Sequence, residues 1–497
     1  LIRTRRHAAF ARGGADAGDN RVSNILAIGV HLPRLRLSRG AMANALGWLT
    51  GGAGAGKGSR TLAYWDEDSV TMAVAAARHA LARQAAPAID ALQFASTTPP
   101  FAEPQNAAFV RAALRLPATT LTQDVHGTPR AGLLALHMAL ESGTRTLVAA
   151  ADLPAALPGS TAEARAGDGG AAVLTGDEPG LLRYLGGASL SAPFTDRYRA
   201  AGHDYPQEWE ERWLREAGYL ELVHDAIGRA LQAASLRPEQ IDHFVLPCPV
   251  HGVAAAVAAK AGLAQARLAS ALAENCGDTG AAHAFVMLGR ALEEAAPGQK
   301  VLVAQFGQGA TALLFEAGEA VAGLAAPVSP ALQDGLAEDN YMKLLAFRGR
   351  IAWDRGLRGR FLVNEALSTA WRNADALLGF VGGRCRETGQ VQFPPTRLAA
   401  ADGFHLDTQE PWPLADRRGR IATFTADLLA FSPCPPNCYG LVDIDGGGRV
   451  LMEFTDPRAS QLEAGAAVAF ALRIKDLDPQ TGYRRYFWKA LAAPTAD

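Results

Sequence analysis

Apolar and polar residues form a regular pattern from residue 21 onward. The segment RVSNILAIGVHLP at 21–33 is rich in β-branched and apolar residues and ends at a proline, which predicts a buried strand. The segment SVTMAVAAARHALARQA at 69–85 repeats its apolar residues at about the 3.6-residue period of a helix packed on one face. A strand followed by such a helix indicates an α/β layer.

Two later stretches, 121–152 and 268–309, follow one plan. Each has a segment that ends in a tight glycine-containing elbow, then an amphipathic helix, then a buried strand. Each half closes with a glycine-flexed turn that leads into an apolar strand, at 166–176 and 306–318. The pattern therefore predicts an internal repeat of half a domain.

The chain changes character after this repeat. A polar and aromatic connection at 194–236 joins the two halves, and its composition predicts a helix after Pro206. A domain boundary is expected between 325 and 375. From Thr423 the hydrophobic period falls to two and turn residues recur at short intervals, which predicts a small β-barrel.

Composition narrows the class of protein. The 48 basic and 50 acidic residues give a net charge of −2, so no basic field suggests a nucleic acid or an anionic membrane as a partner. With 49% apolar and 20% charged residues the chain is globular, and no apolar run is long enough for a membrane span. We expect a cytoplasmic protein, because its cysteines are few and scattered: Cys248, Cys276, Cys385, Cys434 and Cys438.

Several motifs together resemble one superfamily. They are ILAIGVHLPRLRL, DVHGTPRAG, GDGGAAVL, WEERWLREAGY, CGDTGAAHAF and FGQG. Over residues 22–320 they resemble the thiolase superfamily, in its hydroxymethylglutaryl-CoA synthase and ketoacyl synthase III branch. The tail, with LLGFVGGRCRETGQVQFPPTRL, TFTADLLAF and YFWKA, resembles the rubredoxin-like ribbon plus OB-fold domain that accompanies thiolase-type enzymes.

The resemblance implies a fold and a division of the chain. The fold is α/β, a five-layered thiolase fold of two pseudo-repeated halves, followed by a C-terminal small β-barrel of the OB-fold type. The expected parts are a flexible leader at 1–20, thiolase-like halves at 21–193 and 194–325, a linker with helical connection at 326–372, and a degenerate ribbon plus OB-fold domain at 373–497.

The chain departs from the resembled family where that family keeps its catalytic residues. The family has a cysteine at the first elbow, a histidine in the second half and a glutamate after an earlier strand. Alignment of the motifs places Pro129, Pro247 and Thr97 at these positions. An asparagine of the second elbow corresponds to Asp278. The usual acyl-cysteine route is therefore not expected, since an unactivated hydroxyl is a weak nucleophile.

Four residues are candidates for catalysis, and each has an ordinary structural alternative. Asp278 is the first candidate general base, although a carboxylate before a helix is also a common cap. Thr128 is a candidate nucleophilic hydroxyl that His126 would activate. Alternatively, His126 polarises a carbonyl of the substrate, or it is an ordinary loop histidine. Cys248 is a candidate displaced thiol, as is Cys276, although buried cysteines are often only packing residues.

Three functions therefore stay open. The chain binds an acyl-CoA and makes or breaks a carbon–carbon bond beside the thioester by acid–base chemistry; or it is a catalytically degenerate scaffold that docks a partner thiolase; or it uses a displaced thiol. Coenzyme A thioester is the expected ligand, with no covalently bound cofactor, and the chain is expected to form a homodimer. No zinc is expected, because only Cys385 remains of the two cysteine pairs that the resembled ribbon uses to hold zinc.

Overall fold

The centre of the protein is a ten-stranded sheet built from two halves with the same strand order. The computed structural model describes residues 22–51, 56–84, 88–356, 366–401 and 403–493. The first half contributes β1 (Asn24–His31), β4 (Ala91–Ala95), β5 (Leu121–Val125), β6 (Thr146–Asp152) and β7 (Gly169–Gly176). The second contributes β8 (Leu182–Ser191), β11 (His243–Val245), β12 (Arg267–Leu268), β13 (Lys300–Phe306) and β14 (Gly309–Ala317). From the central pair β1 and β8 outward, the orders are β1-β7-β6-β4-β5 and β8-β14-β13-β11-β12, which confirms the predicted repeat.

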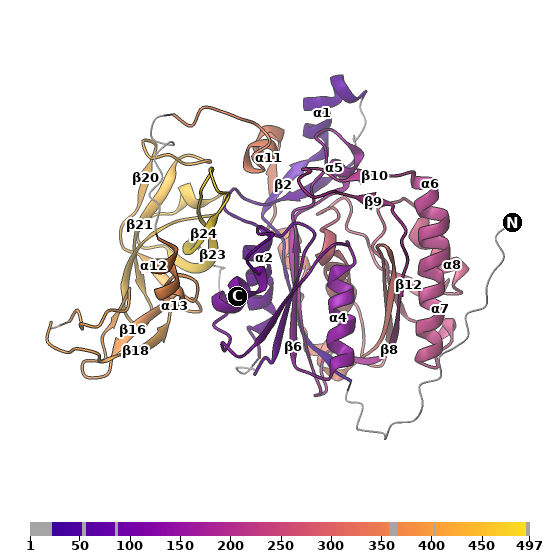
Figure 1. Cartoon of the computed structure of the whole chain (residues 1–497), viewed down its shortest axis with the longest axis horizontal. Coiled ribbons are helices and arrows are strands. Elements are labelled where there is room, and N and C mark those ends of the chain that lie inside the picture. The colour runs from indigo at the N-terminus through magenta and orange to yellow at the C-terminus, as the bar shows by residue number, and fades with distance from the viewer. Residues whose placement is uncertain (1–21, 52–55, 85–87, 357–365, 402, 494–497) are drawn as a thin grey trace.

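Helices cover and separate the two halves, giving five layers (Figure 1). The middle layer holds α4 (Ala131–Ser142) and α9 (His283–Leu292), which contact each other. Every residue of α9 except Arg290 is buried, as expected of a helix that is apolar all round. The outer layers hold α2 (Ser69–Leu81) on the first half, and α7 (His224–Ala233) and α8 (Val253–Lys260) on the second.

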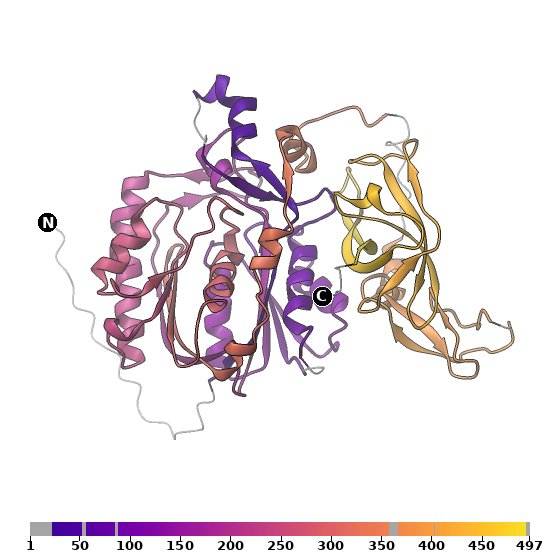
Figure 2. The same cartoon turned by 180° about the vertical axis from the view of Figure 1, so that it is seen from behind.

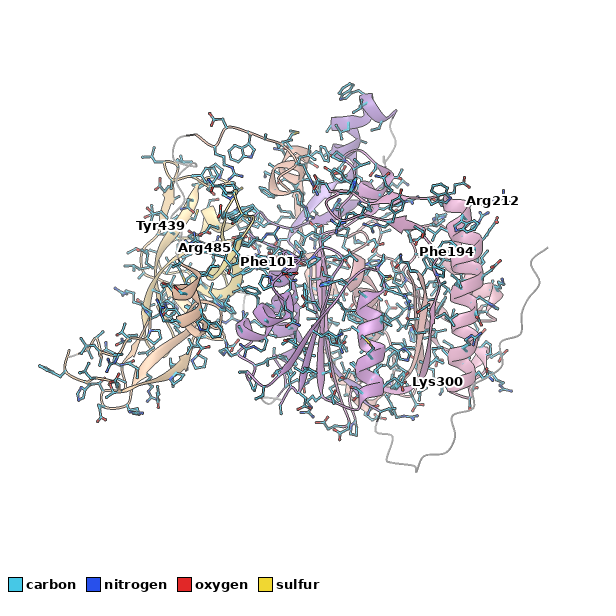
Figure 3. The ribbon with its side chains drawn as sticks, in the orientation of Figure 1. Phe101, Phe194, Arg212, Lys300, Tyr439 and Arg485 are labelled. Carbon is cyan, nitrogen blue, oxygen red and sulfur yellow. The ribbon has the colours of Figure 1, made fainter. Side chains whose placement is uncertain are left out.

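The segment 194–236, predicted to connect the halves, is helical where the sequence predicts it, but it lies within the second half because β8 precedes it. After the two-stranded pair β9 (Arg197–Tyr198) and β10 (Gln207–Glu208), a continuous helix begins with α6 (Glu211–Trp213). It continues through a π-helical stretch at Leu214–Val223 into α7. Phe194 at the start of the connection stacks on Trp213, with 5.4 Å between the ring centroids (Figure 3).

Short elements complete the thiolase-like part and the connection. A three-stranded sheet contains β2 (Leu35–Ser38), β3 (Ser59–Leu62) and β15 (Leu336–Glu338). The small helices are α1 (Arg39–Thr50), α3 (Asn106–Ala113), α5 (Thr161–Arg165), α10 (Ser329–Gln333), α11 (Tyr341–Phe347), α12 (Leu367–Arg372) and α13 (Ala374–Leu377), with single 3-10 turns at Pro238–Gln240, Gly280–Ala282 and Glu319–Gly323. The connection predicted at 326–372 thus returns one strand, β15, to the thiolase-like part, and the last helices, α12 and α13, lie beside the ribbon and the barrel (Figure 1).

The C-terminal part is a three-stranded ribbon followed by a barrel, as predicted. The ribbon contains β16 (Val381–Cys385), β17 (Val391–Gln392) and β18 (Gln409–Pro413). The barrel contains β19 (Gly419–Ile421), β20 (Thr425–Asp427), β21 (Asn437–Ile444), β22 (Arg449–Glu453), β23 (Ala467–Leu477) and β24 (Arg484–Ala492). A bridge between Phe454 and Ala490 joins the end of β22 to β24. The barrel lies beside α2. In the view from behind, α11 of the connection lies between the thiolase-like part and the barrel (Figure 2).

The two parts are held together by a buried ionic contact and by aromatic rings. Asp66 is fully buried and lies 3.0 Å from Nζ of Lys489 of β24. Asp68 receives a hydrogen bond from the Tyr486 hydroxyl (2.7 Å). Phe101, at the boundary in Figure 3, lies 5.5 Å from Tyr483 between ring centroids. The thiolase-like part and the barrel therefore share one continuous interface.

Candidate functional site

The first elbow, between β5 and α4, is tied to the turn between β13 and β14. The Thr128 hydroxyl donates to the carbonyl oxygen of Gly307 at 3.0 Å. Arg130 is buried, and its Nε donates to the same oxygen at 2.6 Å. Its guanidinium also donates to hydroxyl oxygens of Ser189 (2.9 Å) and Thr311 (2.8 Å). The elbow is rigid, and the Thr128 hydroxyl already has a structural partner.

Pro129 stands at the centre of this elbow, one residue before the buried Arg130. Its carbonyl oxygen accepts a hydrogen bond from Nε2 of Gln305 at 3.1 Å. Gln305 is buried, and its Oε1 has no hydrogen-bond partner among the described residues. A proline side chain offers neither a nucleophile nor a titratable group.

His126 is turned toward residues other than Thr128. Its Nδ1 lies 3.0 Å from the carbonyl oxygen of Ser96, and its Nε2 lies 3.5 Å from Oδ2 of Asp124. The hydrogen bond with Asp124 raises the pKa of His126 above its usual range. Both ring nitrogens therefore face partners other than the Thr128 hydroxyl, so His126 and Thr128 are not paired in the structure.

Asp152, at the end of β6, organises the neighbouring loops. Its side chain is fully buried and accepts six hydrogen bonds of 2.7–3.1 Å. The donors are Ser96 Oγ, the backbone and hydroxyl groups of Thr97 and Thr98, and the backbone N–H of Ala281. Thr97, at the glutamate position of the resembled family, is thus held as a structural donor.

Sequence reasoning missed Asp152, although a signal is present. The strand TLVAAAD is apolar until its last residue, and a carboxylate at the end of a buried strand needs partners. The bond to Ala281 joins this loop to the second elbow, which lies 129 residues further along the chain. A Cβ atom on Gly280 would lie 2.3 Å from Oδ2 of Asp152, so this close approach requires glycine.

The second elbow places Asp278 close to Cys248 and Tyr219. Asp278 Oδ1 accepts a hydrogen bond from the backbone N–H of Gly280, the first residue of the 3-10 turn before α9, at 2.9 Å. The Tyr219 hydroxyl donates to the carbonyl oxygen of Pro247 at 3.2 Å and lies beside Cys248. Burial, with smaller contributions from Cys248 and Asp278, raises the pKa of Tyr219. The charge of Asp278 therefore acts on both Cys248 and Tyr219, and the sequence did not indicate Tyr219.

Neither candidate thiol is activated. Burial, with a smaller contribution from the charge of Asp278, raises the pKa of Cys248 to about 11. Burial also raises the pKa of Cys276 to about 12, and its Sγ lies 3.3 Å from the carbonyl oxygen of Gly277. Both groups are neutral thiols near neutral pH, which are poor nucleophiles.

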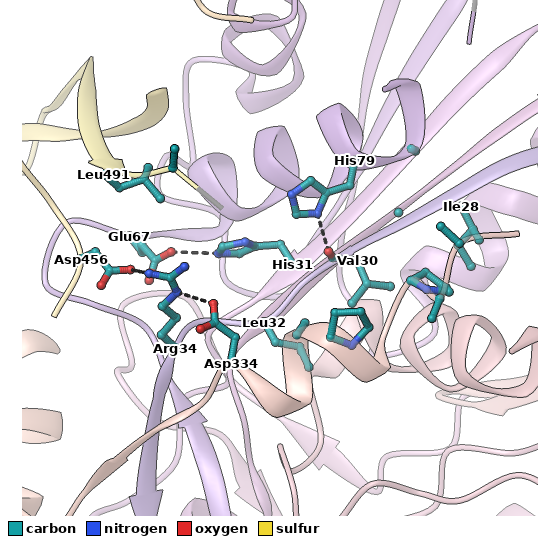
Figure 4. A pocket seen from close by; sticks show the side chains of 18 of the residues that line it. Ile28, Val30, His31, Leu32, Arg34, Glu67, His79, Asp334, Asp456 and Leu491 are labelled. Atoms are coloured by element: carbon teal, nitrogen blue, oxygen red, sulfur yellow. Dashed lines mark hydrogen bonds and ion pairs between the residues drawn. The ribbon is translucent and has the colours of Figure 1, made fainter. Parts of the chain in front are cut away.

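A second polar cluster, which the sequence did not indicate, lies at the boundary between the two parts (Figure 4). It lines a cavity of about 1060 Å³ between β1, α2 and the barrel. His31 Nε2 lies 2.9 Å from Oε1 of Glu67, and Arg34 pairs with Asp456 at 2.5 Å. Burial raises the pKa of Glu67, but Arg473 and His31 outweigh it and hold the value at about 2. The pairs of Arg34 with Asp456 and of Glu67 with Arg473 cross the boundary between the two parts.

The described residues contain no group of three or more His, Cys, Asp or Glu side chains arranged to hold a metal ion. Cys385 of the ribbon contacts the hydroxyl of Thr408 (3.2 Å). That the ribbon binds no zinc stays a prediction. No helix in the described part of the chain has the length and apolar character of a membrane span.

Comparison with family models identifies two regions. Residues 231–316 match the model described as 3-oxoacyl-[acyl-carrier-protein (ACP)] synthase III C terminal. Residues 412–473 match the model described as the ChsH2 C-terminal OB-fold domain. These matches fall on the second half of the thiolase-like part and on the barrel.

Comparison with whole proteins agrees with these matches. The chain is 32% identical to the hydroxymethylglutaryl-CoA synthase of Aeropyrum pernix over 254 residues, which cover 49% of this chain and 70% of that protein. Among solved structures, 3-oxoacyl-(acyl carrier protein) synthase III of Pseudomonas aeruginosa has a TM-score of 0.53 at 23% identity, covering 60% of this chain and 98% of that one. A hydroxymethylglutaryl-CoA synthase complexed with CoA has a TM-score of 0.58 at 17% identity, covering 69% and 95%. These likenesses confirm the predicted fold.

Proposed function

This chain belongs to the hydroxymethylglutaryl-CoA synthase family, and from that we propose that it binds an acyl-CoA thioester between its two halves and makes or breaks a carbon–carbon bond beside the thioester, without an acyl-cysteine intermediate. Relatives named as hydroxymethylglutaryl-CoA synthase support the substrate class, as does the related structure described as complexed with CoA. Coenzyme A thioester is then the ligand of the site, and no cofactor is bound covalently.

The residues of the first elbow are the observation that supports chemistry without an acyl-cysteine intermediate. Pro129 occupies the position that the family's motif gives to cysteine, and the neighbouring Thr128 hydroxyl donates to Gly307. The thiols Cys248 and Cys276 have raised pKa values, so thiolate is scarce at either. Acid–base chemistry at the substrate's α-carbon requires no protein nucleophile.

Asp278 is the proposed general base for this chemistry. It lies at the second elbow beside Cys248 and Tyr219, and the bond between Asp152 and Ala281 fixes that elbow. The Tyr219 hydroxyl stays protonated because its pKa is raised, so it remains a hydrogen-bond donor. His126 is the proposed group for polarising a carbonyl, since its raised pKa favours the cationic form.

One set of contacts favours a rival function, that of a catalytically degenerate scaffold for a partner thiolase. Thr97 is hydrogen-bonded to Asp152, Thr128 to Gly307 and Asp278 to Gly280, so three of the positions considered for chemistry make structural hydrogen bonds. The OB-fold domain would then provide the docking surface. The two functions differ in whether the chain removes a proton from an acyl-CoA.

Exchange of the α-hydrogens of acetyl-CoA in deuterated buffer, followed by mass spectrometry, tests the proposal. We expect the protein to catalyse exchange, and Asp278→Asn to slow it about 10²–10⁴-fold, because the amide keeps the cap but is not a base. Asp225→Asn, on the exposed face of α7, is the matched control and should leave exchange unchanged. Absent exchange would favour the scaffold, whereas exchange that is equal in wild type and Asp278→Asn would contradict the proposed role of Asp278 as the base.

A further inference from the structure

A second cavity, of about 690 Å³, opens where the barrel, the connection and two loops of the thiolase-like part meet. Thr98 and Leu153 line its inner wall, and these residues lie next to the Asp152 cluster. Trp353 of the connection and Phe431 of the barrel line its outer wall. The cavity thus lies beside the loops of the candidate site but is built largely from the connection and the OB-fold domain.

The lining of this cavity carries an excess of positive charge. Seven basic and five acidic side chains line it. The acidic side chains all have cationic partners: Glu67 pairs with Arg473, Asp68 with Arg484, Asp204 with Arg350, Glu453 with Lys475 and Asp476 with Arg485. Arg348 pairs with the buried Asp168 outside the cavity. Two guanidinium groups, those of Arg199 and Arg355, have no carboxylate partner among the described residues.

The contacts of these two arginines leave their charge available. Arg199 donates one hydrogen bond, to the carbonyl oxygen of Thr97 at 3.2 Å. Arg355 lies over the rings of Trp353 and Phe431, 6.0 and 5.8 Å from their centroids. A guanidinium supported on an aromatic face keeps its edge free for the paired hydrogen bonds that phosphate oxygens accept.

The two aromatic rings offer a surface for a planar group. Trp353 and Phe431 are stacked, with centroids 5.9 Å apart and ring planes 27° from parallel. Trp353 remains 42% exposed, so one more ring has room to lie against it. Offset stacking of aromatic rings is a favourable arrangement, and every nucleobase has a face for it.

We propose that this junction cavity binds an adenine-type nucleotide, with its base against Trp353 and its phosphates at Arg199 and Arg355. Cationic and aromatic groups that face one cavity of this size match a ligand with a planar base and phosphate charge. Two sources share this chemistry, the nucleotide half of coenzyme A and a free adenine nucleotide. Only binding of coenzyme A rests on the proposed function. If coenzyme A is the ligand, the rest of the thioester extends from Thr98 toward the Asp152 cluster.

Calorimetric titration with adenosine 3′,5′-bisphosphate tests the site directly. We expect binding to the wild-type chain, weakened about 10- to 100-fold in Arg199→Gln and in Arg355→Gln, because each variant loses a charged hydrogen bond to phosphate. Arg212→Gln removes an exposed arginine of α6 outside the cavity and should leave the affinity unchanged. Equal melting temperatures of the variants exclude a folding defect as the cause.

Titration with acetyl-CoA in the same variants separates the two sources. The cavity is assigned to coenzyme A if acetyl-CoA and the bisphosphate compete and if the two substitutions weaken the binding of both ligands. Independent binding of both ligands assigns it to a free nucleotide. Unchanged bisphosphate affinity in both variants, or no binding to the wild type, overturns the proposal. If the cavity fails this test but the protein still binds acetyl-CoA, the proposed function stands. If the protein binds the bisphosphate but not acetyl-CoA, the proposed function is contradicted and the nucleotide site stands.

Discussion

His126 shows how strongly a single side chain of the site depends on its neighbours. Its raised pKa comes from Asp124, so folding favours the protonated ring. The stability from this pair is therefore fully present below the unfolded pKa of about 6.5, and is lost as pH rises through the higher folded value. The side chain is 39% exposed, so screening by solvent keeps the contribution below about 1 kcal/mol.

Melting temperatures of wild type and His126→Gln across about pH 5.5–8.5 test this dependence. We expect the variant to be less stable at the acidic end, and the difference to shrink as pH rises. His203→Gln, in an exposed turn, controls for the loss of an imidazole. A difference that stays constant, or grows with pH, would contradict the described pairing of His126 with Asp124.

At the residue scale, the sequence indicated the elbows better than the groups that fix them. The charge of Asp278 acts on Cys248, and both were candidates because they lie in recognisable motifs. Asp152 and Tyr219 were missed because their partners come from distant segments, as when Asp152 bonds Ala281. Spacing along a chain cannot reveal such pairs. The proposed roles of Asp278, Thr128, His126 and Cys248 stay predictions.

At the scale of elements, periodicity predicted the repeat because each half must bury its apolar strands between helices. The common strand order of the two halves confirms it. The stretch ATFTADLLAF was less regular than its pattern indicated, since only Thr425–Asp427 forms a strand there. Leu428 and Leu429 are exposed in the loop that follows, so their apolar character does not report a buried strand.

Strand β5 is the element that supports the predicted homodimer. It ends the sheet and pairs only with β4 among the described strands. Leu121 is 72% exposed on it, and an edge strand with an exposed apolar residue is a surface on which a second copy can pair. The Gln105 side chain bonds the carbonyl oxygen of Thr122 (2.9 Å) and covers only part of this edge.

Sedimentation equilibrium tests dimerisation through β5. We expect the wild type at twice the chain mass of 52.2 kDa, and Leu121→Asp at the mass of one chain, because the substitution places like charges on the shared edge. Leu268→Asp changes an exposed residue of β12, at the opposite end of the sheet, and should stay dimeric. A monomeric wild type, or a dimeric Leu121→Asp, would contradict this interface.

At the scale of the whole molecule, the interface between the two parts depends on charges that lie far apart in the sequence. Burial lowers the pKa of Lys489, but Asp66 and Glu453 outweigh it and raise the value. Lys489 lies 3.0 Å from both carboxylates and is almost fully buried. The sequence showed both domains, yet it could not show this interface, because no local pattern marks a pair that spans 423 residues.

Lys489→Met should lower the free energy of unfolding by about 3–5 kcal/mol, since it leaves two carboxylates without their buried cation. Urea denaturation measures this loss. Lys475→Met removes a lysine that also pairs with Glu453 but is 45% exposed, and it should cost no more than about 1 kcal/mol. The double variant Asp66→Asn with Lys489→Met should lose less than the sum of its single changes. Strict additivity would show that the pair is not coupled.

The central claim is that the chain binds an acyl-CoA without forming an acyl-enzyme, and mass spectrometry after incubation with acetyl-CoA tests it most directly. The account predicts a native mass that includes bound acetyl-CoA and a denatured mass equal to that of the unmodified chain, because Pro129 provides no nucleophile and burial keeps Cys248 and Cys276 as thiols. A stoichiometric acetyl adduct on Cys248 or Cys276 in the denatured chain, or no acetyl-CoA in the native one, would contradict the account.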